Sequence, residues 1–246
     1  MRGYQDDLAY IHDAGFSDYA LDAAPGLLRI LRRSGIARGL VVDLGCGSGR
    51  WARELNRAGY EVVGVDQSRA MIRLARRIAP TSRFTVASLW SAILPQCDAV
   101  TSLGECLNYR FGHANRSHSL LRLFRRVYRA LGPGGIFVFD FAGLGRRPQR
   151  GTRMRQSAGR DWSVTASTIA HGPHRIRRRI VALRQIGKKS RRSEEIHCLE
   201  LYAVREMCET LKRCGFRVHA VRGYGRFRFP QGINGVVAMK PGRRSI

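Results

Sequence analysis

Acidic residues are scarce in this chain of 246 residues, in which 18 Asp and Glu face 44 Lys and Arg for a formal net charge of +26. Lysine is also scarce, so arginine carries most of the charge, and residues 146–192 hold 15 basic residues with Asp161 as the one acid. Such a surface indicates either contact with nucleic acid or acidic substrates, or a solvated basic face. Aromatic residues that could stack on bases are sparse there, with Trp162 alone. The sequence therefore favours the solvated face, with weak, salt-sensitive binding of polyanions.

Long apolar runs are absent, since none reaches the ~18 residues that a helix needs to cross a bilayer. The N-terminus lacks the apolar core of a signal peptide. The six cysteines stand singly, without a C-x-x-C pair, which indicates neither a zinc site nor a disulfide framework. Hydrophobic residues make up 44% of the chain, enough for a sizeable core. We expect a soluble cytoplasmic protein without a bound metal.

A glycine-rich segment is the most informative part of the chain. Residues 41–49 read Val-Val-Asp-Leu-Gly-Cys-Gly-Ser-Gly, ahead of a helical stretch. This is typical of a buried strand that turns sharply into a helix N-terminus, where glycines let the backbone approach a ligand. Asp66 ends a second apolar strand 21 residues after Gly45, about where nucleotide-binding folds place a carboxylate on ribose hydroxyls. No Gly-Lys-Ser/Thr follows, which argues against a phosphate loop.

Apolar periodicity divides most of the chain into alternating strands and helices, which predicts a parallel sheet covered on both faces. A helical region before the glycine segment is expected to break at Pro25-Gly26. The expected strands cover residues 39–44, 61–66, 84–87, 98–102, 136–141, 216–221 and 236–239.

Residues 144–202 change to a two-residue alternation, in which Glu195, His197, Leu199 and Leu201 share one face. This predicts an antiparallel insertion of about three strands.

The spacing Gly45-x-Gly47-x-Gly49, with Asp43 before it and Asp66 after it, resembles motif I of the class I S-adenosylmethionine-dependent methyltransferases. A dinucleotide fingerprint would need a third glycine at position 50, which is arginine. The resemblance extends over nearly the whole chain, including Leu-Gly-Pro-Gly-Gly at 131–135. The insertion is similar to that of small-molecule methyltransferases such as the amino-sugar N-methyltransferases, where it roofs the acceptor pocket.

This resemblance implies an α/β fold with a Rossmann-like, doubly wound sheet of seven strands, mostly parallel, with the last strand antiparallel. It also implies three parts: an N-terminal helical lid (1–36), a cofactor-binding core (37–143 and 203–246) and an antiparallel β insertion that caps the acceptor site (144–202).

The implied cofactor is S-adenosylmethionine, which becomes S-adenosylhomocysteine. The glycine loop would hold its methionine part, Asp43 would orient the loop or the cofactor's amino group, and Asp66 would bind the ribose. Many relatives have an acid where this chain has Ser88. The implied cofactor-binding residues are Asp43, Gly45, Cys46, Gly47, Asp66, Gln67, Ser88, Leu89, Leu103 and Gly104.

Methyl transfer is an in-line displacement, so the protein mainly positions the reactants and excludes water, and a base is needed only if the acceptor arrives protonated. The candidate catalytic residues are Glu105, Tyr109 and His197, with His113 and Glu195 as further candidates on the acceptor side. Tyr10 and His12 are expected to belong to the lid.

The first functional hypothesis is N- or O-methylation of a small molecule. The alternatives are an RNA or DNA methyltransferase that docks through the Arg-rich insertion, and an inactive basic binding module with the same fold. The chain has no Asn-Pro-Pro-Tyr, which many methyltransferases of nucleobase amino groups carry after the fourth strand. A homodimer stays open, and no membrane partner is expected.

Overall fold

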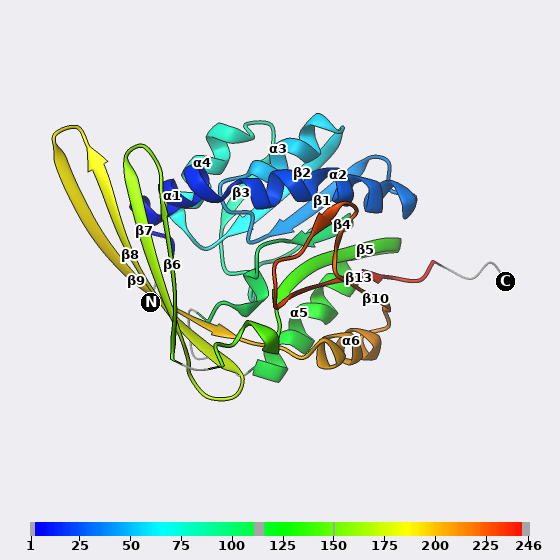
Figure 1. The fold of residues 1–246 in the computed structure, drawn as a ribbon. Coiled ribbons are helices and arrows are strands. Elements are labelled where there is room, and N and C mark those ends of the chain that lie inside the picture. The colour runs from blue at the N-terminus through cyan, green and yellow to red at the C-terminus, as the bar shows by residue number, and fades with distance from the viewer. Residues whose placement is uncertain (1–2, 111–115, 150, 243–246) are drawn as a thin grey trace.

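The computed structural model describes residues 3–110, 116–149 and 151–242, and a sheet of seven strands forms its centre. These strands are β1 (Gly39–Leu44), β2 (Tyr60–Asp66), β3 (Arg83–Val86), β4 (Cys97–Ser102), β5 (Leu131–Ala142), β10 (Arg217–Val221) and β13 (Ile233–Met239). Their order is β10-β13-β5-β4-β1-β2-β3, and β13 runs antiparallel to the other six strands. The predicted doubly wound α/β fold with an antiparallel last strand is confirmed (Figure 1).

The helices are α1 (Asp6–Phe16), α2 (Asp18–Arg33), α3 (Arg50–Arg57), α4 (Arg69–Ile78), α5 (Arg116–Ala130) and α6 (Val204–Arg213). Helices α2, α3 and α4 cover one face of the sheet, and α5 and α6 cover the other (Figure 1). In β1, Val41 packs in the core between the sheet and α2, α3 and α4. Val42 and Leu44 pack in the core between the sheet and α5 and α6. Successive side chains of a strand point to opposite faces, so a doubly covered strand is apolar throughout.

The predicted break at Pro25-Gly26 is wrong, because α2 continues through both residues. Gly26 is a packing glycine instead: a Cβ there would overlap the backbone carbonyl of Tyr224, in the short hairpin of β11 (Gly223–Tyr224) and β12 (Phe227–Arg228). The glycine signal therefore marks a close contact between helix and hairpin, which a local pattern does not distinguish from a helix end.

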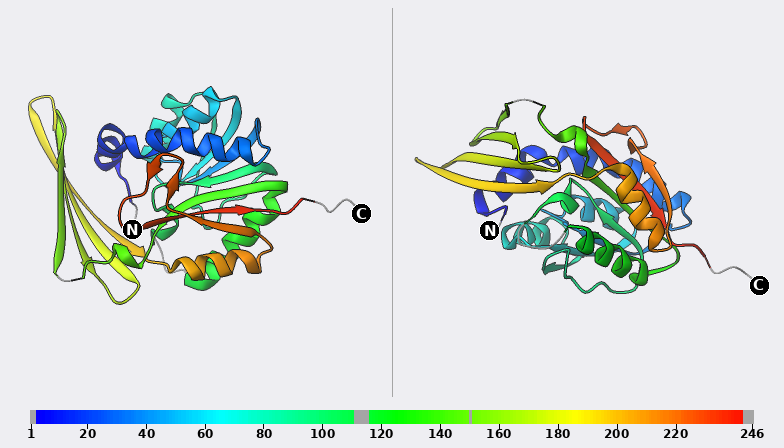
Figure 2. Two further views of the ribbon diagram at one scale, coloured as in Figure 1. Left: turned by 45° about the vertical axis from the view of Figure 1, so that its right-hand side comes forward. Right: turned by 90° about the horizontal axis from the view of Figure 1, so that it is seen from below.

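A second, antiparallel sheet stands at one end of the core, as Figures 1 and 2 show. Its strands, in spatial order, are β6 (Thr152–Ala158), β7 (Trp162–Ala170), β8 (Arg175–Ile186) and β9 (Lys189–Glu200). The expected count of about three strands was one too low. Strand β6 is an edge strand of mainly exposed, polar residues, so it lacks the apolar alternation on which the expectation depended.

Helix α1 lies between the four-stranded sheet and α4. Its Leu8 and Ile11 pack against Val164 of β7 and Ile180 of β8 in a small apolar cluster. Asp7 in its first turn forms ion pairs with Arg184 and Arg191 of the β8–β9 hairpin. The N-terminal helix is therefore fixed to the second sheet. None of the helices described here combines the length with the apolar character that a membrane-spanning helix requires.

Buried Asn108 connects the second sheet to the core. It ends the short 3₁₀ helix η1 (Cys106–Asn108), and its side-chain amide donates to the carbonyls of Ala142 in β5, at 2.9 Å, and of Glu200 in β9. Its Oδ1 accepts the backbone N–H of Ala142 at 2.8 Å. One side chain thus joins three segments that are distant in sequence.

Replacing Asn108 by alanine is expected to lower the free energy of unfolding by about 2 kcal/mol, because buried backbone groups lose their partners. Urea titration of both proteins measures the difference. Asn108→Asp keeps the acceptor for Ala142 but loses the donor, so it should also destabilise the protein. Unchanged stability in both variants would mean that water replaces the amide.

Candidate active site

Three glycines shape the loop between β1 and α3. Gly45, Gly47 and Gly49 have φ angles of +78°, +53° and +79°, a region that side chains with a Cβ rarely adopt. A Cβ at Gly45 would overlap the sulfur of Cys106, whereas a Cβ at Gly47 would meet no atom within 4 Å. The loop therefore packs tightly on one side and leaves the backbone of Gly47 open toward a cavity.

The carboxylate of Asp66, at the end of β2, holds this loop. Its Oδ2 accepts the N–H of Gly47 at 3.0 Å, and its Oδ1 accepts the N–H of Ser68 at 2.8 Å. Burial nevertheless raises its pKa above the ordinary value, while these hydrogen bonds act in the opposite direction. Asp66 therefore connects the glycine loop to the start of α4 and lines the same cavity.

A chain of buried hydrogen bonds fixes Asp43 at the end of β1. Trp51 Nε1 donates to Thr101 Oγ1 at 3.1 Å, and Thr101 Oγ1 donates to Asp43 Oδ1 at 2.7 Å. Burial is the main cause that raises the pKa of Asp43 to about 7, with nearby Asp66 adding to it. A cationic group in the cavity beside Asp43 would favour its ionised form.

All ten cofactor-binding residues proposed from the sequence line this first cavity, at the carboxyl ends of the parallel strands. They are Asp43, Gly45, Cys46, Gly47, Asp66, Gln67, Ser88, Leu89, Leu103 and Gly104. The sequence interpretation missed other lining residues, among them Tyr4, Phe16, Tyr19, Met71 and Trp90. The lining combines Asp43, Asp66 and the glycine loop with apolar side chains such as Met71, Leu89 and Trp90. Such a lining suits an amino-acid-bearing nucleoside, which has both polar and apolar parts.

A buried acid that the sequence interpretation missed supports the loop after β4. Asp140 Oδ1 accepts the N–H groups of Gly104 and Glu105, at 2.9 and 2.8 Å. Both residues have positive φ, +81° for Gly104 and +64° for Glu105, the latter uncommon for a side chain with a Cβ. Burial raises the pKa of Asp140 to about 7. The one sequence signal for it was an acid near the end of the apolar strand 136–141.

A second cavity adjoins the first, between the core, α1 and the four-stranded sheet. Strands β6, β7 and β8 supply one wall, with Val164, Ala166, Ile176 and Ile180 among its apolar residues. The residues that line both cavities, and so form their shared wall, are Tyr4, His12, Phe16, Tyr19, Gly104 and Tyr109. Among the described residues, these are the ones at which a molecule in one cavity can approach a molecule in the other.

Two tyrosines meet at the shared wall, with the hydroxyls of Tyr4 and Tyr109 2.8 Å apart. Tyr4 has a φ of +55° and is held at both ends: its N–H donates to Glu195 Oε2 at 2.7 Å, and its carbonyl accepts Ser68 Oγ–H at 2.6 Å. Burial is the first cause that raises the pKa of both tyrosines, so their hydroxyls stay protonated at neutral pH. They are neutral hydrogen-bonding groups at this position.

Of the three proposed catalytic residues, Tyr109 lines both cavities and Glu105 lines the second. Glu105 is held by two arginines, with Arg146 Nη2 at 3.1 Å from Oε1 and Arg178 Nη2 at 3.4 Å from Oε2. Its side chain is only 12% exposed. Both carboxylate oxygens are thus engaged by cations.

His197 is placed differently. It is 1% exposed and lines neither cavity; its ring lies behind Tyr4 and Tyr109, with centroid distances of 5.1 and 5.5 Å. Its Nε2 lies 2.8 Å from Glu195 Oε2. His197 and Glu195 therefore support the tyrosine pair from behind. His113, the further candidate, lies outside the described residues.

Of the two proposed lid residues, His12 lines both cavities, whereas the hydroxyl of Tyr10 donates to Asp161 Oδ2 at 2.8 Å, at the second sheet. Burial lowers the pKa of His12 to about 4, so its imidazole is neutral at physiological pH. The shared wall thus contains neutral polar groups from α1 and from the segment before it.

The comparisons with known proteins agree with this geometry. Residues 41–135 match a family profile described as a methyltransferase domain. The putative methyltransferase YqeM of Bacillus subtilis is 26% identical over 192 residues, which cover 75% of this chain and 76% of that protein.

Two solved structures share the fold across nearly the whole chain. An S-adenosylmethionine-dependent methyltransferase from Clostridium acetobutylicum superposes with a TM-score of 0.81 at 18% identity, covering 95% of this chain and 98% of that one. The sugar N-methyltransferase KedS8 from Streptoalloteichus superposes with a TM-score of 0.77 at 20% identity, covering 98% of this chain and 94% of that one. At these identities the likeness is one of fold.

Proposed function

We propose that this chain is a class I S-adenosylmethionine-dependent methyltransferase and that it methylates a nitrogen or oxygen atom of a small molecule. The observation that carries the proposal is the pair of cavities with one shared wall. The first cavity suits the cofactor. The second, covered by the four-stranded sheet, adjoins the first and is proposed to receive the acceptor, which must approach the methyl group in line.

In this proposal the cofactor supplies an electrophilic methyl group on a sulfonium, and the protein holds both reactants. Asp66 would bind the ribose hydroxyls, and Asp43 would face the amino group of the methionine part; both residues line the first cavity. The lone pair of the acceptor's nitrogen or oxygen would take the methyl group, the electron pair of the broken bond would stay on sulfur, and the acceptor's proton would pass to water. Tyr4 and Tyr109 contact the acceptor atom, and neutral His12 accepts a hydrogen bond from it.

Glu105 and His197 have positioning roles in this proposal. Because Arg146 and Arg178 pair with the two carboxylate oxygens of Glu105, this residue orders the wall of the acceptor cavity. His197 lines neither cavity and fixes the tyrosine pair. An amine acceptor that enters as the free base then needs no further general base.

Calorimetry with S-adenosylhomocysteine tests the enzyme class, and absence of binding at millimolar ligand would falsify it. Incubation with methyl-labelled cofactor and a metabolite extract tests the acceptor class. Nuclease digestion of the extract beforehand separates the alternatives: a small-molecule acceptor survives it, whereas an RNA or DNA acceptor does not. Absence of labelled product from the digested and from the undigested extract, despite cofactor binding, would favour the inactive binding module.

Cofactor affinity is expected to fall about tenfold between pH 8 and pH 6. The pKa of Asp43 is about 7 in the free protein, and a bound ammonium group favours its ionised form, so binding releases a proton below that pH. Calorimetry with S-adenosylhomocysteine at several pH values measures the slope. Asp43→Asn should bind more weakly and lose the slope; if the variant keeps it, another group titrates.

A further inference from the structure

Four arginines line the acceptor cavity: Arg146 in the short 3₁₀ helix η2 (Leu144–Arg146), Arg153 and Arg155 on β6, and Arg178 on β8. The carboxylates on the same lining are Glu105 and Asp18. His12 is neutral at physiological pH, because burial lowers its pKa to about 4. The described lining therefore has a formal excess of two positive charges.

These arginines are of two kinds. Arg146 and Arg178 pair with Glu105, and their side chains are 15% and 18% exposed. For Arg153 and Arg155, no carboxylate in the described part of the chain lies within ion-pair distance, and no side-chain hydrogen bond is formed there. Their charges are thus available to a molecule that enters the cavity.

Strand geometry sets the direction of these two side chains. Arg153 and Arg155 are two residues apart on β6, so they point to the same face, about 7 Å apart along the strand. Met154 between them points away from the cavity and is 62% exposed. A planar guanidinium binds carboxylate or phosphate oxygens through two parallel hydrogen bonds. The pair is therefore placed where two guanidinium groups can face one oxyanion, at the outer strand of the cavity wall.

The rest of this wall is mainly apolar, and its polar side chains are Ser157, Thr168 and Arg178, whose charge is paired with Glu105. Between this pair and the shared wall, β7 and β8 present Val164, Ala166, Ile176 and Ile180 to the cavity. An acceptor that fills the space therefore has an uncharged middle, an anionic end and a methylatable atom at the other end. On the basis of the proposed function, we propose that the acceptor carries a carboxylate or phosphate group. This group is bound by Arg153 and Arg155, while the nucleophilic atom of the acceptor lies at Tyr4 and Tyr109.

The chain offers a matched control for its overall charge. Arg177 follows Ile176 on β8 but points to the opposite face, and Arg160 lies in the turn between β6 and β7; neither lines either cavity. The double variants R153Q/R155Q and R160Q/R177Q therefore remove the same net charge, and only the first alters the acceptor cavity.

The test measures anion binding by calorimetry to protein saturated with S-adenosylhomocysteine, at ~0.15 M salt to screen surface charge. The probes are inorganic phosphate and pyrophosphate on one side, and succinate and citrate on the other. We expect at least one probe to bind, with affinity at least tenfold weaker in R153Q/R155Q and within twofold of the unmodified protein in R160Q/R177Q. Whether phosphates or carboxylates bind more tightly identifies the oxyanion.

Equal losses in the two double variants, or no binding of any probe to the unmodified protein, would overturn this inference alone, provided that S-adenosylhomocysteine still binds. Failure of S-adenosylhomocysteine to bind the unmodified protein would overturn the proposed function. With an acceptor from the extract screen, R153Q/R155Q should raise KM at least tenfold and leave kcat nearly unchanged, because the oxyanion is bound equally before and during methyl transfer. A fall in kcat without a change in KM would contradict the assignment.

Discussion

Replacing Asp66 by alanine is expected to weaken the binding of S-adenosylhomocysteine by about 3 kcal/mol, more than 100-fold. In our proposal the variant loses the charged hydrogen bonds to the ribose. It also frees the N–H groups of Gly47 and Ser68, which the carboxylate accepts at 3.0 and 2.8 Å, so the glycine loop loses its support. Calorimetry measures the change.

Two further variants serve as controls for the Asp66→Ala measurement. Asp66→Asn keeps one side-chain oxygen and should lie between the alanine variant and the unmodified protein. Glu61→Ala alters an exposed acid on the same strand and should bind the ligand normally. If Asp66→Ala keeps the full affinity, the ribose is held by other groups and the assignment of the first cavity is wrong.

Replacing Glu195 by alanine is expected to lower the free energy of unfolding by about 3 kcal/mol and to weaken cofactor binding at least tenfold. Its buried carboxylate accepts the N–H groups of Tyr4 and Gln5, both at 2.7 Å, and contacts His197. Without it the segment before α1 loses its attachment to β9. Tyr4 and His12, which line both cavities, then lose their fixed positions.

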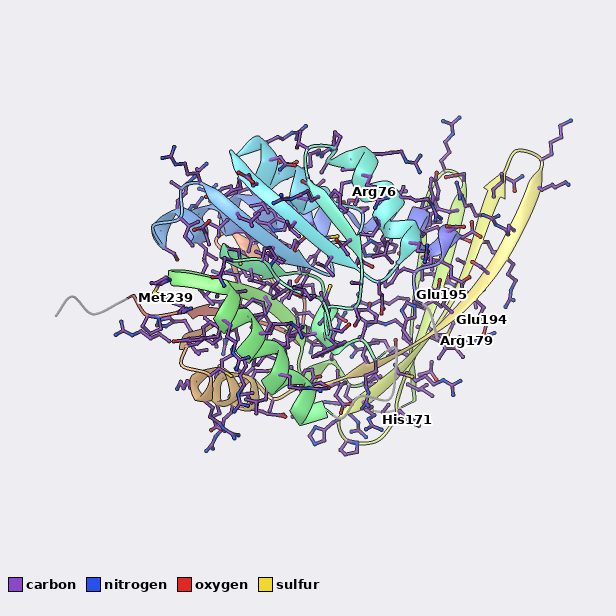
Figure 3. All side chains as sticks on the ribbon, turned by 180° about the vertical axis from the view of Figure 1, so that it is seen from behind. Arg76, His171, Arg179, Glu194, Glu195 and Met239 are labelled. Atoms are coloured by element: carbon purple, nitrogen blue, oxygen red, sulfur yellow. The ribbon has the colours of Figure 1, made fainter. Side chains whose placement is uncertain are left out.

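The neighbouring acid provides the control. Glu194 precedes Glu195 on β9 but points to the opposite face, where it pairs with Arg179 at 2.6 Å (Figure 3). Exposed ion pairs contribute little to stability, so Glu194→Ala should leave unfolding and cofactor binding unchanged. Urea titration and calorimetry on both variants give the comparison. Similar losses in both would show that the effect comes from the charge of the hairpin and not from the attachment of the N-terminal segment.

Local patterns predicted most of the core correctly. Buried strands with apolar side chains toward both faces, and helices with one apolar face, depend on residues near one another in sequence. Strand β6 shows the limit of prediction from local patterns, because its exposed residues carry no periodic signal. The uninterrupted helix α2 shows the same limit, since Gly26 allows a close contact with Tyr224, which is far along the chain.

The proposed cofactor residues could be read from the sequence because they follow single strands: the glycine loop follows β1 and Asp66 ends β2. Asp140 could not be read in the same way. An acid in an apolar strand has no evident partner until the fold brings it to the backbone of Gly104 and Glu105, more than thirty residues earlier.

The order of residues along the chain was sufficient to predict a methyltransferase, its cofactor and the loop proposed to receive it, because these predictions depend on short segments with their own backbone requirements. The acceptor side depended on the tertiary structure. Arg153 and Arg155 look like any other arginines of a basic stretch until the pairing of β6 with β7 directs them into a cavity. Tyr4 and Tyr109 likewise meet only when α1 docks on the second sheet, since side chains so distant in sequence are brought together by packing alone.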